Sequence, residues 1–180
     1  MTNFVLDCCT LINLYCGWGG LQNLQQIGPS FHLGQRVVDE ILFIRDFDDD
    51  GSIVNHRLSA DEVFLQYHFS ILSLSSAGEE NLMVRLATKL DDGEAEGLAL
   101  ASCRGFVFCS DDKPVADAAR AEGLNTAIIS TPELLQMWAG NNASRLSSLP
   151  AIIRRTSILG RFCPHRSSPF RTWWEKQRER

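Results

Sequence analysis

The chain of 180 residues has no apolar run long enough to cross a bilayer, and its first residues, MTNFVLD, lack the charged-then-apolar order of a signal peptide. Its six cysteines include no C-x-x-C pair, and its four histidines are scattered. A disulfide framework and a zinc site are therefore disfavoured. We expect a cytoplasmic protein with reduced thiols and no membrane contact.

Two motifs of other enzyme classes are also missing. The glycine-rich segment 17–20 has neither the G-x-G-x-x-G order nor a following Lys-Ser/Thr pair, so a nucleotide-binding loop is not indicated. Position 9, two residues after Asp7, is a cysteine and not the second aspartate that an aspartyl-phosphate phosphatase needs. We expect Cys8 and Cys9 to be small buried side chains rather than nucleophiles.

Charge is distributed unevenly along the chain. Residues 154–180 hold eight basic and two acidic side chains, a net charge of +6, whereas residues 1–153 sum to −11. A body this acidic is a poor general binder of nucleic acid, because phosphates must be neutralised by Lys and Arg. Either the carboxylates bind metal ions or the basic tail binds the partner. The tail also carries Trp173 and Trp174, which must pack on the body or on a partner.

Short apolar segments alternate with amphipathic ones, in a chain whose length suits one main domain. Strands are expected at residues 4–6, 71–74, 106–109 and 126–129. Helices are expected from residue 11, over 37–44, after a capping box formed by Ser59 and Glu62, over 79–90, 94–103 and 115–122, and from a cap at Thr131. The segments 46–51 and 92–93 predict turns. This alternation predicts an α/β protein, a three-layer α/β/α sandwich with a mostly parallel central sheet.

Periodicity weakens after residue 140, so we divide the chain into a main domain at residues 1–140 and a C-terminal extension at residues 141–180. The extension is expected to begin with a helix over residues 143–160. It should continue as a semi-ordered basic appendage over residues 161–180.

Acidic residues fall at the ends of expected strands and the starts of expected helices. Asp7 ends the first strand, Asp111 and Asp112 follow a later strand, and Glu40 and Glu94 lie near helix starts. All of them would face the carboxyl edge of a parallel sheet, where ligands bind. Clustered carboxylates repel unless a cation neutralises them, and hard oxygen ligands suit Mg²⁺ or Mn²⁺. Each residue alone also fits an N-cap or a solvated first-turn position.

The segments 7–14, 37–41, 93–101 and 109–113 resemble the four acidic motifs of PIN-domain nucleases, and the resemblance extends over about residues 3–140. It implies an α/β sandwich whose acidic pocket binds one or two Mg²⁺ or Mn²⁺ ions and hydrolyses RNA phosphodiesters. Asp7, Glu40 and Glu94 correspond to the first three metal-site acids. The fourth is Asp111 or Asp112, and the spacing from Ser110 favours Asp112. The chain departs from the pattern at positions 8 and 9, where cysteines replace the usual hydroxyl or amide residues.

The function expected from this resemblance is a divalent-metal-dependent endoribonuclease, either the toxin of a toxin–antitoxin pair or a related PIN ribonuclease. Its catalytic acids would be Asp7, Glu40, Glu94 and Asp112, with Asp111 beside them as a further metal ligand. An inhibitory antitoxin protein would cover the pocket, and the pattern allows a homodimer. RNA contacts are expected from Arg36, Lys113, Arg154 and Arg155. The alternative is a PIN-fold module that binds a protein, with weak or no catalysis.

Overall fold

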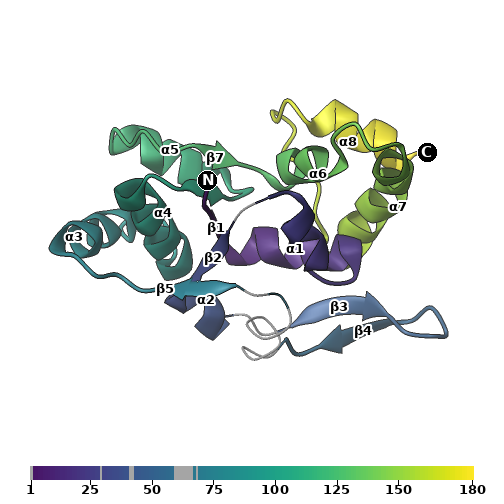
Figure 1. Ribbon diagram of the computed structural model, residues 1–180, viewed down its shortest axis with the longest axis horizontal. Coiled ribbons are helices and arrows are strands. Elements are labelled where there is room, and N and C mark those ends of the chain that lie inside the picture. The colour runs from purple at the N-terminus through teal and green to yellow at the C-terminus, as the bar shows by residue number, and fades with distance from the viewer. Residues whose placement is uncertain (1, 29, 41–42, 59–66, 68) are drawn as a thin grey trace.

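The computed structural model describes residues 2–28, 30–40, 43–58, 67 and 69–180. Its central sheet has the order β5-β2-β1-β6-β7, and all of its described pairings are parallel. The strands are β1 (Phe4–Leu6), β2 (Phe31–Gly34), β5 (Ser70–Leu72), β6 (Val107–Cys109) and β7 (Ile128–Ile129). The chain starts in the middle of the sheet and adds strands first on one side and then on the other (Figure 1). The predicted parallel sheet is confirmed.

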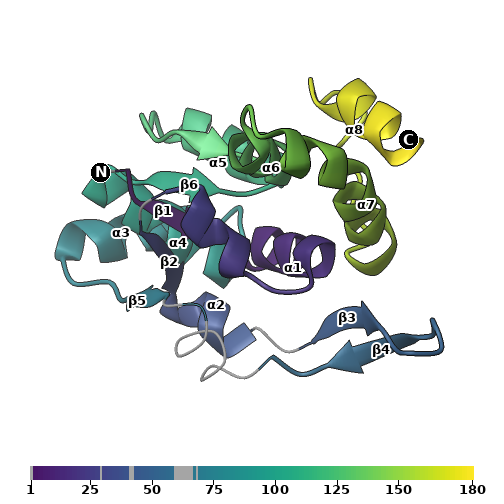
Figure 2. The same ribbon diagram turned by 45° about the vertical axis from the view of Figure 1, so that its right-hand side comes forward.

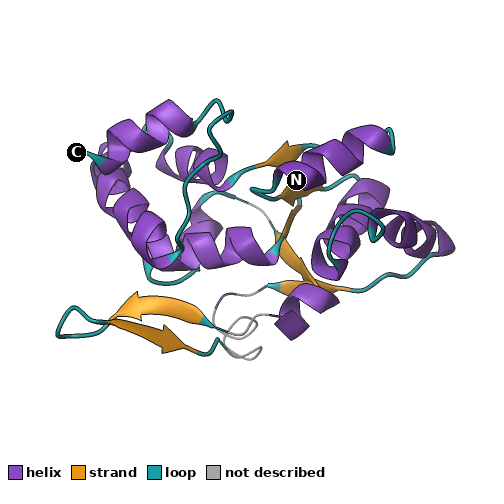
Figure 3. Cartoon of the chain, turned by 180° about the vertical axis from the view of Figure 1, so that it is seen from behind, coloured by secondary structure: helices purple, strands orange, loops and turns teal. Residues whose placement is uncertain are grey.

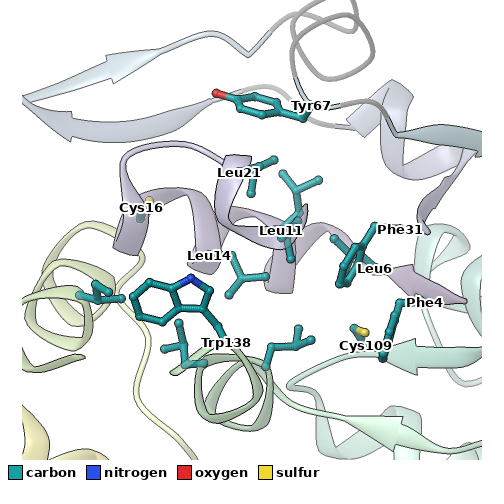
Figure 4. Packing of buried hydrophobic residues seen from close by; sticks show 14 of the residues in the cluster. Phe4, Leu6, Leu11, Leu14, Cys16, Leu21, Phe31, Tyr67, Cys109 and Trp138 are labelled. Atoms are coloured by element: carbon teal, nitrogen blue, oxygen red, sulfur yellow. The ribbon is translucent and has the colours of Figure 1, made fainter. Parts of the chain in front are cut away.

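Helices cover both faces of this sheet. One layer holds α1 (Cys8–Trp18), α6 (Thr131–Ala139) and α7 (Ala143–Leu159), and the other holds α3 (Ala77–Leu86), α4 (Asp92–Arg104) and α5 (Lys113–Ala121). Each face has its own apolar core, because Leu6 of β1 packs with the first layer and Val5 with the second. In the first core, Leu11 and Leu14 of α1 lie between Tyr67 and Trp138 (Figure 4). The chain therefore has the three-layer α/β/α sandwich that its pattern predicts.

Helix starts are set by local capping. The Asp91 side chain accepts a hydrogen bond from the backbone N–H of Glu94, so α4 begins at Asp92 and the turn expected at residues 92–93 is wrong. Ser130, not Thr131, caps α6, and its backbone N–H donates to Glu133 at 2.8 Å. Both helices begin one or two residues earlier than expected, because the capping side chain, and not the first apolar residue, sets the start of a helix.

The helix expected over residues 37–44 is wrong at its end. Helix α2 runs over Gln35–Glu40, and Ile44 begins an antiparallel hairpin of β3 (Ile44–Phe47) and β4 (Ile53–His56) that projects from the body (Figures 1 and 2). Ile44 is buried against the core that contains α1. Strand β2 was not expected, because its four residues include His32 and Gly34 and carry no β-branched run. Of the turn expected at residues 46–51, residues 48–51 form the hairpin tip, whereas Asp46 and Phe47 belong to β3.

The extension packs against the body. Helix α7 lies along α1 at Gly17, where an added Cβ would collide with the Thr156 side chain. Helix α8 (Arg171–Arg178) follows, and its Trp174 is fully buried, with Nε1 donating to Ser157 Oγ at 3.0 Å. Residues 161–180 are therefore not semi-ordered, because burial of Trp174 fixes α8 on α7 (Figure 2).

The capping box predicted from Ser59 and Glu62, with the helix after it, lies outside the described residues. The remaining short element, η1 (Gln22–Gln26), is a 3₁₀ helix between α1 and β2. In the part of the chain that the structure describes, no helix is long and apolar enough to cross a membrane. Figure 3 shows the sandwich from behind, with the long loop that joins α7 to α8.

Candidate active site

The sheet topology brings two acidic segments together. Strands β1 and β6 are paired neighbours, with Leu6 opposite Cys109, so Asp7 and the Ser110–Asp112 segment leave the same carboxyl edge. The chain reverses its direction of strand addition at β1. A crevice at such a reversal point is the usual ligand site of an open parallel sheet. The placement of these acids agrees with the expectation from sequence.

Asp7, Glu94 and Asp112 form an acidic cluster in which one carboxylate oxygen of each lies within 4.8 Å of the others. Asp7 is 2% exposed. It caps α1, because its Oδ1 accepts a hydrogen bond from the Thr10 backbone N–H at 2.6 Å. Its Oδ2 is buried and has no hydrogen-bond partner among the described residues. Asp7 is thus an N-cap that keeps one oxygen free for another ligand.

Burial raises the pKa of Asp7 to about 7, despite lowering by hydrogen-bond donors of Ser110 and Thr10. Burial, followed by the negative charges of Asp91 and Asp112, raises the pKa of Glu94 to about 7. Asp112 stands at the N-cap position of α5, yet its side chain makes no capping hydrogen bond. The cluster therefore stores electrostatic repulsion that a cation would relieve.

Asp111 is used differently from Asp112. Its Oδ1 accepts a hydrogen bond from the Thr131 backbone N–H at 2.9 Å, and its Oδ2 accepts from Asn13 Nδ2 at 3.0 Å and from the Thr131 hydroxyl at 2.5 Å. Both oxygens therefore accept hydrogen bonds, from the start of α6 and from the middle of α1. The structure places Asp111 beside the acidic cluster, as a connection between helices.

Glu40 lies across a small recess from the acidic cluster. The recess has a volume of about 20 Å³, room for roughly one water or ion, and its acidic lining residues are Asp7, Glu40, Asp91 and Glu94. Burial and the charges of Asp91 and Asp92 raise the pKa of Glu40. Asp91 was missed in the sequence, although its position directly before Asp92-Gly93-Glu94 is typical of an N-cap.

Glu96 is a second acidic residue whose role the sequence did not indicate. It is buried, and its Oε2 accepts a hydrogen bond from the Arg36 backbone N–H at 2.8 Å, in the first turn of α2. Gly34 lies directly beside it, and an added Cβ there would displace the same carboxylate oxygen. Glu96 thus fixes the start of the helix that carries Glu40. The sequence signal that could have indicated this role is its position two residues after Glu94, which directs the two side chains to different sides of the same helix.

The expectation that Cys8 and Cys9 are buried is wrong, since Cys9 is exposed and Cys8 is half-buried at the first turn of α1. Desolvation, with Asp7 as the next cause, raises the pKa of Cys8 to about 11 and that of Cys9 to about 12. Both thiols therefore stay protonated at neutral pH. All six cysteines are unpaired.

The four basic residues expected to contact RNA have different surroundings. Arg36 pairs with Asp92 at 2.5 Å, and Arg155 pairs with Asp46 at 2.7 Å while donating to the Cys16 carbonyl. Lys113, at the start of α5 next to Asp112, is 69% exposed and pairs with Asp117 at 3.8 Å. Arg154 is exposed on α7. Lys113 alone of the four directly follows a member of the acidic cluster, and RNA contact by any of them stays a prediction.

In this α/β sandwich the carboxylates gather where the order of strand addition changes side. This arrangement is typical of proteins that bind a divalent cation. A family model described as a PIN domain matches residues 3–129. The chain therefore belongs to the PIN-domain family, whose members are in general nucleases. No curated protein and no solved structure matches the chain. The extension from residue 141 onward lies outside the family match.

The residues present fit a divalent ion. Mg²⁺ and Mn²⁺ prefer oxygen ligands, and the acidic cluster supplies three carboxylate oxygens within 4.8 Å of one another. The unpartnered Oδ2 of Asp7 is the strongest sign, because a buried polar atom without a partner costs about 1–3 kcal/mol. A cation would satisfy this atom and neutralise its neighbours.

Proposed function

We propose that the protein is a divalent-metal-dependent endoribonuclease, with Mg²⁺ or Mn²⁺ held by Asp7, Glu94 and Asp112. The observation that supports it is the acidic cluster, in which a buried Asp7 oxygen has no partner among the described residues. Glu40 completes the set from across the recess, and Glu96 holds its helix in place. Asp111 serves the site by positioning Asn13 and α6.

A divalent ion at this position supplies Lewis-acid activation of water and stabilises negative charge on the leaving oxygen. The protein residues have separate tasks. Glu94, in the first turn of α4, supplies one of the three carboxylates that would hold the ion. Lys113 provides a positive charge beside Asp112 that favours an approaching phosphate, and its exposed pair with Asp117 at 3.8 Å leaves the ammonium accessible. Ser110 Oγ accepts a hydrogen bond from the Asp112 backbone N–H at 3.2 Å, and Ser110 also lowers the pKa of Asp7, so this residue acts on both acids.

The test is a cleavage assay on single-stranded RNA with Mn²⁺, using two adjacent variants. Asp112→Asn should abolish cleavage and leave the melting temperature unchanged or higher, because it removes charge from a repulsive cluster. Asp111→Asn should lower the melting temperature, because the amide cannot accept from both Asn13 and Thr131. Asp49→Asn, on the exposed hairpin tip, is the matched control and should change neither property. Full activity of Asp112→Asn would contradict the proposal.

We further propose that the protein is the cytoplasmic toxin of a toxin–antitoxin pair, with an antitoxin protein that covers the carboxylates. Membership of the PIN-domain family supports this setting. Expression of the chain in a bacterial host should arrest growth, and Asp112→Asn should remove the arrest at equal protein level. Folded wild-type protein that neither cleaves RNA nor slows growth would favour a PIN-fold module that binds a protein.

A further inference from the structure

The loop between α7 and α8 forms one wall of a cavity next to the acidic cluster. We name this cavity the tail cleft. It has a volume of about 520 Å³, and its lining includes Cys9, Asp112, Lys113, Arg161, Phe162 and His165. A second cavity of about 470 Å³ lies along α5 and α6, and Asp112, Lys113, Phe162 and His165 line it as well. The extension therefore encloses space that starts at the candidate active site.

The tail cleft adjoins the acidic cluster. Asp112 belongs to the acidic cluster and lines the tail cleft, and Cys9 lines both the tail cleft and the small recess. The small recess has room for roughly one ion, whereas the tail cleft has the size of a pocket for an organic ligand. A phosphodiester placed at the carboxylates would thus have its neighbouring nucleotide in the tail cleft.

The wall of the tail cleft is built and held in place. Gly160 sits against α1 so closely that an added Cβ would lie 2.7 Å from Asn13 Oδ1. Arg171 of α8 donates to the Pro164 carbonyl at 2.9 Å, and the ring of Phe162 packs edge-on against Trp174 at 5.1 Å. These contacts fix both ends of the segment 160–165. A preformed wall lowers the entropy cost of binding a ligand.

Arg161 brings a free positive charge to this wall. It is exposed and has no hydrogen bond or ion pair with any residue that the structure describes. Its backbone φ of 51° lies in the left-handed region, which is uncommon for residues other than glycine. Backbone strain of this kind is found where surrounding structure imposes the conformation, and it clusters at ligand sites. Lys113 faces the same cavity from α5.

We infer that the tail cleft binds the nucleotide adjacent to the cleaved phosphodiester of a single-stranded RNA, with Arg161 and Lys113 contacting its phosphate. Phe162 offers apolar surface to the base. Single-stranded RNA suits the surroundings, because residues 1–153 carry a net charge of −11, which disfavours the extended backbone contact that a duplex needs. The inference rests on the proposed function and gives the extension, which lies outside the family match, a role in substrate binding.

The test compares Arg161→Gln with Arg178→Gln. Arg178 is exposed in the same extension, but it lines neither cavity. Binding of a fluorescent single-stranded RNA octamer is measured by anisotropy with Ca²⁺ at several salt concentrations. Arg161→Gln should raise Kd about tenfold, as expected for loss of a charged hydrogen bond, and reduce the logarithmic salt slope by about 0.7. Arg178→Gln should bind like wild type. In the cleavage assay with Mn²⁺, Arg161→Gln should raise KM and leave kcat unchanged.

The outcomes separate this inference from the proposed function. Suppose that wild type cleaves RNA. If Arg161→Gln then changes neither Kd nor KM, or if Arg161→Gln and Arg178→Gln lose affinity equally, the inference is overturned and the proposed function stands. If wild type binds the octamer through Arg161 but cleaves no RNA, the tail cleft is supported and the proposed function is overturned. A melting temperature of Arg161→Gln equal to that of wild type shows that the fold is intact. Absence of octamer binding by wild type overturns the inference.

Discussion

Asp7→Asn should make the metal-free protein more stable at alkaline pH, although it removes a predicted metal ligand. The unfolded chain releases the Asp7 proton near the ordinary pKa of 3.8, whereas burial raises the pKa in the folded protein to about 7. Between these values the folded state binds the additional proton, so the stability that Asp7 contributes falls as pH rises from 3.8 to 7. Above pH 7 the loss is complete.

The size of this loss follows from the difference in pKa. About three pKa units correspond to about 4 kcal/mol at pH 8 and about 2 kcal/mol at pH 5. Asparagine keeps the oxygen that caps α1, so the Thr10 hydrogen bond survives. Its amide adds a buried donor, whose cost of about 1–3 kcal/mol is the same at both pH values. The stability of Asp7→Asn relative to wild type should therefore be higher at pH 8 than at pH 5 by about 2–3 kcal/mol.

The assay is urea unfolding followed by tryptophan fluorescence, at pH 5 and pH 8, with EDTA and then with Mn²⁺. Wild type should gain about 3 kcal/mol when Mn²⁺ exceeds its Kd a hundredfold, and Asp7→Asn should lose most of that gain. Asp49→Asn is again the control, since Asp49 is exposed at the hairpin tip. The reasoning is refuted if the free energy of unfolding of Asp7→Asn shows the same pH dependence as wild type.

Three further predictions concern the supports of the fold. The Arg104 side chain, followed by Ser75, lowers the pKa of the buried Glu79 from 4.5 to about 2. The free energy of unfolding of wild type should therefore fall by about 3 kcal/mol as pH falls from 4.5 to 2. In acid unfolding curves Glu79→Gln should lose much less. Glu96→Ala should weaken Mn²⁺ affinity and cost about 1 kcal/mol in chemical denaturation, while Glu96→Gln, which keeps an acceptor for α2, should restore most of both. Trp174→Ala should cost about 3–5 kcal/mol because the indole is fully buried, and an unchanged melting temperature would contradict docking of α8.

Local pattern was sufficient for the layers and the edge where the acids gather. The apolar segments ending at Asp7 and at Ser110 predicted two buried strands, and parallel strands place their carboxyl ends on one edge. Asp7 and Asp112 could therefore be placed together without any knowledge of contacts. Strand β2 could not be predicted, because Phe31–Gly34 becomes a strand by pairing with β1 and β5, residues distant in sequence.

Contacts between distant segments decided what each acid does. Spacing from Ser110 favoured Asp112 over Asp111 but gave no reason for the difference. In the structure Thr131 and Asn13 donate to both oxygens of Asp111, whereas Asp112 belongs to the acidic cluster. Glu94 and Glu96 share one motif, yet only Glu96 meets the start of α2. The sequence by itself determined which acidic residues reach the carboxyl edge of the sheet, because their positions follow from the periodicity of single strands and helices. Only the tertiary structure decided which oxygens are already bonded and which remain free, because a hydrogen bond to a buried carboxylate comes from whichever element the fold brings beside it.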